Sequence, residues 1–251
     1  MPDIKNGFHE LQLAVKFIKL FARNSGMEGE AYSNWSHFLI HLQASWDKVE
    51  AGFADTSGTD IGNKFNYLRG LKIHQRKKDP LLKYLWESRN MVVHGVGFSF
   101  RRAMIDKLPA GYTYLSKINK QGIRYDRRQI PVFKTRLLLN TVINKERKFQ
   151  PPTHHLGVPM ENSLDPIEIA IKGISFYFNY IKDTDVEFTR SLSSQQLSAF
   201  WTNFNIAEVI TDAGKLYHIV NFQPEKENTE YYVENTNNFP ITFIHFQGTI
   251  M

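Results

Sequence analysis

The sequence contains no cysteine, and this absence excludes disulfide bonds and thiolate metal sites. It also has no run of about 18 consecutive apolar residues, the length that a membrane-spanning helix requires. The first ten residues, MPDIKNGFHE, show no basic stretch followed by an apolar run, so they do not resemble a secretion signal. We therefore expect a cytoplasmic protein that is not associated with a membrane.

The positive charge of the chain is unevenly distributed. The 251 residues, of which 42% are hydrophobic and 14% aromatic, are enough for one large domain or two small ones with a sizeable core. The net charge is +6, but residues 98–150 carry 13 Lys and Arg against three Asp and Glu, a net +10, which leaves −4 for the rest. Such a segment attracts polyanions, of which RNA and DNA are the commonest, although an ordinary solvated basic surface is the alternative. The candidate RNA-binding residues in it are Arg101, Arg102, Arg124, Arg127 and Arg128.

Apolar residues recur every three or four positions in several segments, and this spacing predicts amphipathic helices. Gly26 and the turn-forming residues 54–58 are the expected ends of the first two helices. Asp79-Pro80 and Asp165-Pro166 each place an N-cap Asp before a Pro at the first helical position, and Glu168 adds the pattern of a capping box. The predicted helices cover residues 8–21, 35–53, a shorter and weaker segment 62–74 closed by the basic run 74–78, 81–94, and 165–186.

Extended segments replace the helical pattern after residue 97. Residues 98–100, 112–115, 123–125 and 130–141 look like strands, with breaks at Pro109, Gly111, Gly122 and Pro131 and an exit at Pro151-Pro152. Near the C-terminus, residues 192–210 look partly helical, and residues 216–222 and 239–246 look like strands. We therefore predict a mainly α protein: a bundle of four to five helices formed by residues 1–97 and 151–190, a basic β-containing insert at 98–150, and a small mixed C-terminal extension at 191–251.

An Arg followed after a few residues by a His occurs three times, and only one copy lies on a well-defined helix. In the copy at Arg69 the next residue is Gly70, which is poor helix interior, and the copy at Arg147 runs into Pro151-Pro152. The copy at Arg89 and His94 lies on the helix predicted for LLKYLWESRNMVVHG, residues 81–95, which has an N-cap before it and ends on Gly95.

The helical geometry brings the polar groups of this copy together. Successive residues turn by about 100° in a helix, so Glu87, Asn90 and His94 share one face, with Arg89 at its border. The opposite side is predicted to be apolar and contains Leu82, Leu85, Trp86, Val92 and Val93.

Imidazole moves protons near neutral pH, and guanidinium binds phosphate in a fork and stabilises charge that develops on it. The trio Arg89, Asn90 and His94 therefore suits metal-independent cleavage of RNA, with the 2′-hydroxyl as internal nucleophile and without a cofactor. The alternative is that His94 only caps the helix and that Arg89 pairs with an acid such as Glu87 or Asp79. Trp35, Trp46 and Trp86 are expected in the core, and His154-His155 are expected to have a loop or surface role, without a metal.

The stretch from Asp79 to Gly95 resembles the HEPN superfamily (higher eukaryotes and prokaryotes nucleotide-binding domains), whose hallmark is Arg, a polar residue, a few apolar residues and His at the end of a helix in an all-α bundle. The resemblance extends over residues 1–97 and 150–190. It includes the aromatic Asn34-Trp-Ser-His-Phe-Leu segment, Pro152-Thr-His-His-Leu-Gly, and the helix that begins with Asp165-Pro-Ile-Glu. Residues 98–150 and 191–251 depart from a minimal bundle of this kind.

The resemblance implies an endoribonuclease of the toxin–antitoxin, abortive-infection or phage-defence type. It also implies a homodimer in which two motifs meet in one composite site, with RNA as substrate and, in a toxin–antitoxin system, a cognate antitoxin as partner. Arg89 and His94 would then be catalytic, and Asn90 would position the phosphate or ribose. The alternative function is a non-catalytic module that binds nucleic acid or an acidic protein through the basic insert, because some members of the superfamily are not nucleases.

Overall fold

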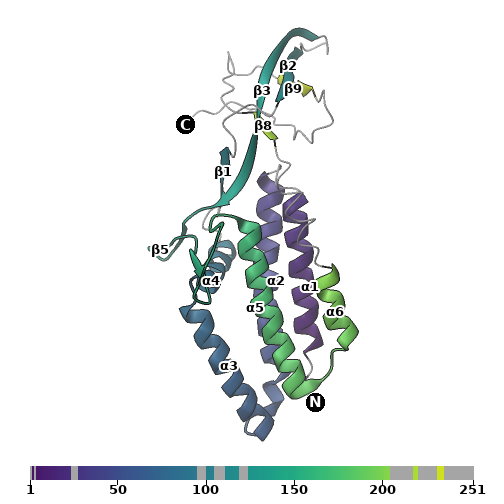
Figure 1. Cartoon of the computed structure of the whole chain (residues 1–251), viewed down its shortest axis with the longest axis vertical. Helices are drawn as coiled ribbons and strands as arrows, with labels where there is room; N and C mark the ends of the chain where they lie inside the picture. Colours follow the sequence, from purple (N-terminus) through teal and green to yellow (C-terminus); the bar gives the residue numbers. More distant parts are fainter. Residues whose placement is uncertain are drawn as a thin grey trace.

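Helices make up most of the regular structure. The structure is a computed structural model that describes residues 2, 4–23, 28–94, 100–104, 111–118, 124–203, 217–219 and 231–234. The helical elements in these ranges are α1 (Lys5–Arg23), α2 (Glu28–Gly52), the 3-10 turn η1 (Ala54–Thr56), α3 (Asp60–Lys78), α4 (Pro80–Val93), α5 (Pro166–Thr184), the π-helical turn η2 (Asp185–Thr189) and α6 (Ser194–Asn203). In Figure 1 these helices lie together in the lower part of the molecule and the largest sheet lies above them.

The core is built where the apolar stripes of α1, α2 and α5 meet. The spacing predicted for the first two helices is confirmed, because their stripes are buried against each other. Helix α6 adds Phe200, whose ring stacks on Phe178 of α5 at 4.7 Å and lies 5.7 Å from the ring of Phe8. The buried residues of the two N-terminal stripes include Phe8, Leu11, Val15, Ile18, Trp35, Phe38, Leu42, Trp46 and Val49.

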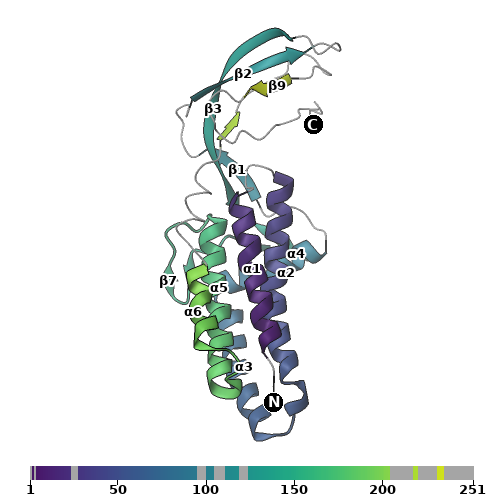
Figure 2. The same cartoon turned by 90° about the vertical axis from the view of Figure 1, so that its right-hand side faces the viewer.

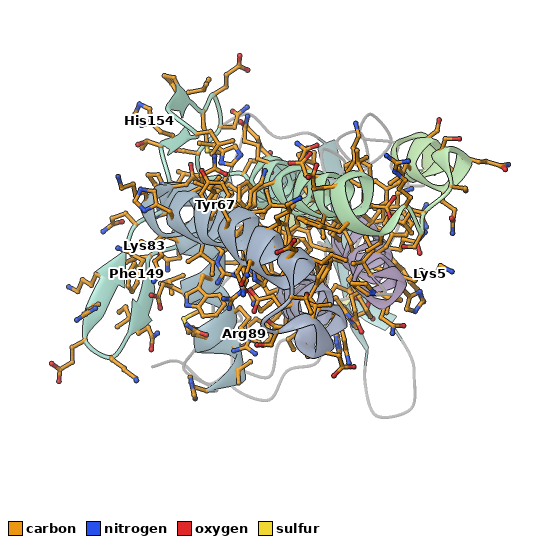
Figure 3. The ribbon with its side chains drawn as sticks, turned by 90° about the horizontal axis from the view of Figure 1, so that it is seen from below. Lys5, Tyr67, Lys83, Arg89, Phe149 and His154 are labelled. Atoms are coloured by element: carbon orange, nitrogen blue, oxygen red, sulfur yellow. The ribbon has the colours of Figure 1, made fainter. Side chains whose placement is uncertain are left out.

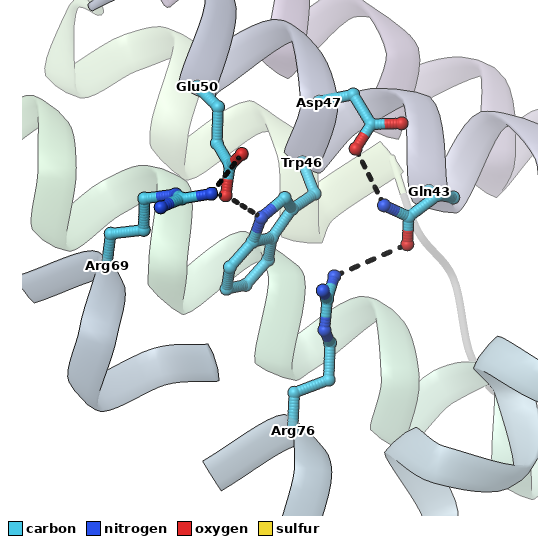
Figure 4. A network of polar contacts seen from close by, with 6 residues as sticks. All are labelled: Gln43, Trp46, Asp47, Glu50, Arg69 and Arg76. Atoms are coloured by element: carbon cyan, nitrogen blue, oxygen red, sulfur yellow. Dashed lines mark hydrogen bonds and ion pairs between the residues drawn. The ribbon is translucent and has the colours of Figure 1, made fainter. Parts of the chain in front are cut away.

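Helix α3 is longer than the sequence predicted, and positively charged side chains lie on the face that packs against the other helices. The basic run 74–78 does not close the helix but forms its last turn. The Arg69 guanidinium donates to both carboxylate oxygens of Glu50, at 2.6 and 2.9 Å. Further along, the Arg76 guanidinium lies 4.4 Å from the Trp46 ring centroid (Figure 4). It also lies 4.6 Å from the ring centroid of Trp86. Long side chains therefore hold α3 against α2 and α4.

Both Asp-Pro helix starts are confirmed. The Asp79 carboxylate accepts a hydrogen bond from the backbone N–H of Leu82, and Asp165 accepts one from Ile167. The Glu168 carboxylate accepts from the backbone N–H of Asn162 at 3.1 Å rather than completing a capping box. Gly26 and Gly95, the predicted ends of two helices, lie outside the described residues.

The strands form one antiparallel sheet and two short hairpins. In the sheet the order is β1-β3-β2-β9, and β8 also pairs with β3 (Figures 1 and 2). Pro131 does not break a strand as predicted, since it lies within β3 and pairs with Tyr112 of β2. The sheet strands are β1 (Phe100–Met104), β2 (Gly111–Ile118), β3 (Arg124–Leu139), β8 (Tyr217–Ile219) and β9 (Tyr231–Glu234), and the hairpins are β4 (Val142–Asn144) with β5 (Arg147–Phe149) and β6 (His154–His155) with β7 (Val158–Pro159).

The fold is thus mainly helical with small antiparallel strand pairs. Residues 239–246, predicted as a strand, lie outside the described residues, as does Gly122. Strands from the predicted insert and from the predicted C-terminal extension pair in one sheet, and the division into domains stays a prediction. In the part of the chain that the structure describes, no helix combines the length and the apolar character needed to cross a membrane.

Candidate functional site

The buried face of α4 lies slightly differently from the prediction. Its stripe runs through Leu81, Leu85, Ser88 and Met91, at steps of three or four residues, with Leu82 and Tyr84 beside it. Val93 was predicted on the apolar side, but it is 50% exposed because it falls at the edge of this stripe. Trp86, predicted in the core, is only half-buried for the same reason, since it lies seven residues before Val93. The edge of α4 therefore carries apolar surface to the end of the helix.

Arg89 and Asn90 lie side by side in the last turn of this helix. Both side chains are half-buried, and the Arg89 guanidinium donates from Nη1 to Asn90 Oδ1 at 3.3 Å. Arg89 Nε is buried and has no hydrogen-bond partner among the described residues. An unsatisfied donor on a charged group costs free energy.

His94 lies at the C-cap of α4. Its backbone N–H donates to the carbonyl of Asn90 at 3.1 Å, and its side chain is exposed. The imidazole is therefore at the surface, one helical turn beyond the amide of Asn90. Figure 3 shows Arg89 on the same half of the molecule as Lys83 and away from Lys5 of α1.

The ion pairs foreseen as an alternative for Arg89 do not form. The Glu87 carboxylate accepts a hydrogen bond from Asn144 Nδ2 at 2.7 Å, and the Asp79 carboxylate is occupied at the other end of the helix. Within the described ranges no carboxylate pairs with Arg89. Glu87 and Asp79 therefore do not neutralise the positive charge of Arg89.

The five arginines predicted to bind RNA lie on two neighbouring strands. Arg101 and Arg102 are on β1, and Arg124, Arg127 and Arg128 are on β3, which pairs with β1 in antiparallel register. The Arg101 side chain is exposed. The side chains of the other four lie outside the described part of the structure, and their role stays a prediction.

Asp79 caps α4 as predicted, and it also binds the β6–β7 hairpin. Its carboxylate also accepts hydrogen bonds from His155 Nδ1 at 3.1 Å and from the backbone N–H of Leu156 at 2.5 Å, both in the β6–β7 hairpin. His154-His155 were expected to have a loop or surface role: His154 is exposed, but the His155 side chain is only 13% exposed. Burial alone would raise the pKa of the Asp79 carboxyl, but the bonds from His155, Leu156 and Leu82 together outweigh burial and lower that pKa.

The β4–β5 hairpin is a second feature that the sequence analysis missed. It packs beside α4, where Asn144 binds Glu87 and the Lys83 ammonium lies 5.6 Å from the centroid of the Phe149 ring. At its base the Tyr84 hydroxyl donates to the carbonyl of Asn140 at 2.7 Å. The basic residues had been counted, but three-residue strands are too short to show a periodicity.

A cavity of about 850 Å³ lies between α3 and the end of α5, lined by Tyr67, Leu68 and Phe188 among others. Among the described residues, no group of three or more His, Asp or Glu is placed to hold a metal ion.

Comparison with known proteins finds no match: no family model fits the sequence, no curated protein is similar to it, and no solved structure matches its fold. The HEPN resemblance therefore rests on the residues of α4 and on the order of the helices.

Proposed function

We propose that this protein is a HEPN-like, metal-independent endoribonuclease of a toxin–antitoxin or phage-defence system. In this proposal the last turns of α4 from two copies of the chain meet, and Arg89, Asn90 and His94 of both form one site. The observation that carries the proposal is the state of Arg89. Its guanidinium is half-buried, has an unsatisfied Nε, and is not paired with a carboxylate among the described residues.

These groups suit cleavage of a phosphodiester by its own 2′-hydroxyl. The exposed imidazole of His94 would take the proton from that hydroxyl or return one to the leaving 5′-oxygen. Arg89 would bind the phosphate and stabilise the charge that develops on its oxygens. Asn90 holds the guanidinium on one side and would donate its amide N–H groups to the phosphate or ribose.

A second copy of the chain would supply the second imidazole that one helix end lacks. Cleavage of this kind uses one proton acceptor and one proton donor, and each helix end offers a single imidazole. Val93, half-exposed and apolar beside His94, gives the helix edge a surface that a second α4 would cover. This supports a dimer with a composite site.

The test is incubation of purified full-length protein with mixed RNA in EDTA. Wild type should cleave, and Arg89→Ala and His94→Ala should each lose at least about a hundredfold in rate. The matched control is His74→Ala, which removes an exposed histidine from the last turn of α3 and should leave the rate unchanged. If wild type leaves all RNA intact but binds it, the protein is the non-catalytic module instead. If all variants cleave equally, the site lies elsewhere.

A further inference from the structure

The tip of the β4–β5 hairpin concentrates positive charge on a short exposed turn. Lys145, Arg147 and Lys148 are exposed, and none of them pairs with a carboxylate in the ranges that the structure describes. Glu146 at the tip is the single acid among them. The tip therefore has a net charge of +2, and its cations are available to an anionic ligand.

The backbone of this turn is unusual for the residues it contains. Lys145 has φ +46° and Glu146 has φ +66°, both in the left-handed region that glycine and asparagine adopt most easily. Each non-glycine residue there costs about 1–2 kcal/mol. Asn144 pairs with Arg147, so Lys145 and Glu146 form a two-residue hairpin loop, which requires positive φ at both positions. The strain therefore belongs to the tight turn that presents the cations.

The hairpin is fixed to the helix that carries the candidate site. Val142 at its base is fully buried, Asn144 binds Glu87, and Phe149 lies under the ammonium of Lys83 (Figure 3). The cations at the tip are thus held at a set position beside α4 rather than on a loose loop.

The same face of α4 leads from the hairpin to the motif. Lys83, Glu87, Asn90 and His94 follow one another at steps of three or four residues and so share one side of the helix. From Glu87, where the hairpin attaches, to His94 the helix rises about 10 Å. A strand held at the hairpin could therefore run along α4 to the motif within a few nucleotides.

We propose that the β4–β5 hairpin binds the phosphate backbone of single-stranded RNA and guides it along α4 to the Arg89–His94 end. The role as a guide rests on the proposed function, whereas the binding of RNA by the hairpin can be tested without it. RNA fits better than an acidic protein because the hairpin is attached to the face of α4 that leads to Asn90, and Asn90 and its neighbour Arg89 suit a phosphate. The arginines of the sheet are not needed for this contact.

The experiment measures binding of a fluorescent single-stranded RNA whose 2′-hydroxyls are methylated, so that it cannot be cleaved. Anisotropy gives Kd between 50 and 200 mM salt for wild type and for the triple variant Lys145→Gln, Arg147→Gln and Lys148→Gln. Loss of three phosphate contacts should flatten the slope of log K against log salt by about 2. The control is Lys16→Gln, Lys48→Gln and Lys64→Gln, which removes the same charge from exposed positions on other helices and should leave the slope close to wild type.

The outcomes separate this inference from the proposed function. Equal slopes for the hairpin triple variant and the control would overturn the inference, even if natural RNA is cleaved. A flattened slope only in the hairpin variant supports it, even if no cleavage is seen. Displacement of the RNA by polyglutamate as effectively as by unlabelled RNA would overturn the assignment to nucleic acid.

Discussion

Replacing Asp79 should destabilise the protein far more than the loss of a helix cap. This carboxylate is 3% exposed and accepts three hydrogen bonds, from Leu82, His155 and Leu156. It thereby ties the start of α4 to a hairpin more than seventy residues later in the chain.

The magnitude follows from the bonds that each substitution removes. In Asp79→Ala, the lost cap costs about 1 kcal/mol. The half-buried backbone N–H of Leu156 loses its acceptor, and the bond to His155 is lost as well, which together add about 2–3 kcal/mol. We therefore expect a decrease of about 3–4 kcal/mol in the free energy of unfolding. Asp79→Asn keeps one acceptor oxygen but no charge and should cost about 2 kcal/mol.

The assay is urea unfolding followed by tryptophan fluorescence. The matched control is Thr59→Ala, because Thr59 caps α3 by accepting from the backbone N–H of Gly62, at 3.1 Å in a part-buried site, and the other hydrogen bond of its hydroxyl, to the Thr56 carbonyl, is exposed and local. The control should cost about 1 kcal/mol. If Asp79→Ala costs no more than Thr59→Ala, the bonds to the hairpin contribute nothing and the reasoning fails.

The same carboxylate should make stability depend on pH in one direction. The pKa of Asp79 is lowered in the folded protein, so the unfolded chain binds the proton more readily. The contribution of Asp79 is therefore complete above the unfolded pKa of about 4 and is lost as the pH falls through the lower folded pKa. The stability difference between wild type and Asp79→Asn should be steady from about pH 5 upward and shrink below about pH 4. A difference that grows on acidification would contradict this sign.

Three further expectations concern other contacts of α4. Arg76→Ala should lower the free energy of unfolding by about 2 kcal/mol and change the tryptophan emission, because it removes the cation between two indole rings, whereas Arg76→Lys should cost about half as much. Val93→Asp should leave urea unfolding within about 0.5 kcal/mol of wild type but give a monomer in sedimentation and no RNA cleavage; a dimer in that variant would place the interface elsewhere. Asn144→Ala removes the bond to Glu87, so it should slow RNA cleavage while the salt dependence of RNA binding stays that of wild type. An unchanged cleavage rate would mean that docking of the hairpin does not matter.

The helices could be predicted where apolar residues alone form the buried face. The stripes of α1, α2 and α5 are of this kind, and their spacing is visible in the sequence. Helix α3 was underestimated because its inward positions include Arg69 and Arg76, which a hydrophobic pattern counts as solvent-facing. Whether a cation faces water or two indole rings depends on residues elsewhere in the chain.

The candidate site, too, could be predicted from the sequence only in part. The position of Arg89 and His94 on one helix end follows from local spacing and the Asp-Pro start, so the sequence was enough to place them. The partners of Glu87 and Asp79 were not predictable, since they lie on hairpins 57 and 76 or more residues away in sequence. From charge complementarity, Glu87 and Asp79 were possible partners for Arg89. In the structure these carboxylates instead accept hydrogen bonds from residues far away in the sequence.

The contacts along α4 differ in a way that bears on function. Its first turn is held by Asp79 and the β6–β7 hairpin, and its middle by the bonds Tyr84–Asn140 and Glu87–Asn144. Among the described residues the polar side chains of the last turn have no comparable hydrogen bond to another element: Arg89 contacts only its neighbour Asn90 by hydrogen bond, and His94 is exposed, whereas Met91 is buried in the core. A site that must hold groups in place while accepting a ligand or a second protomer needs a rigid support and an unoccupied end. Helix α4 has both, and this is why its end, rather than the arginines of the sheet, is where we expect chemistry.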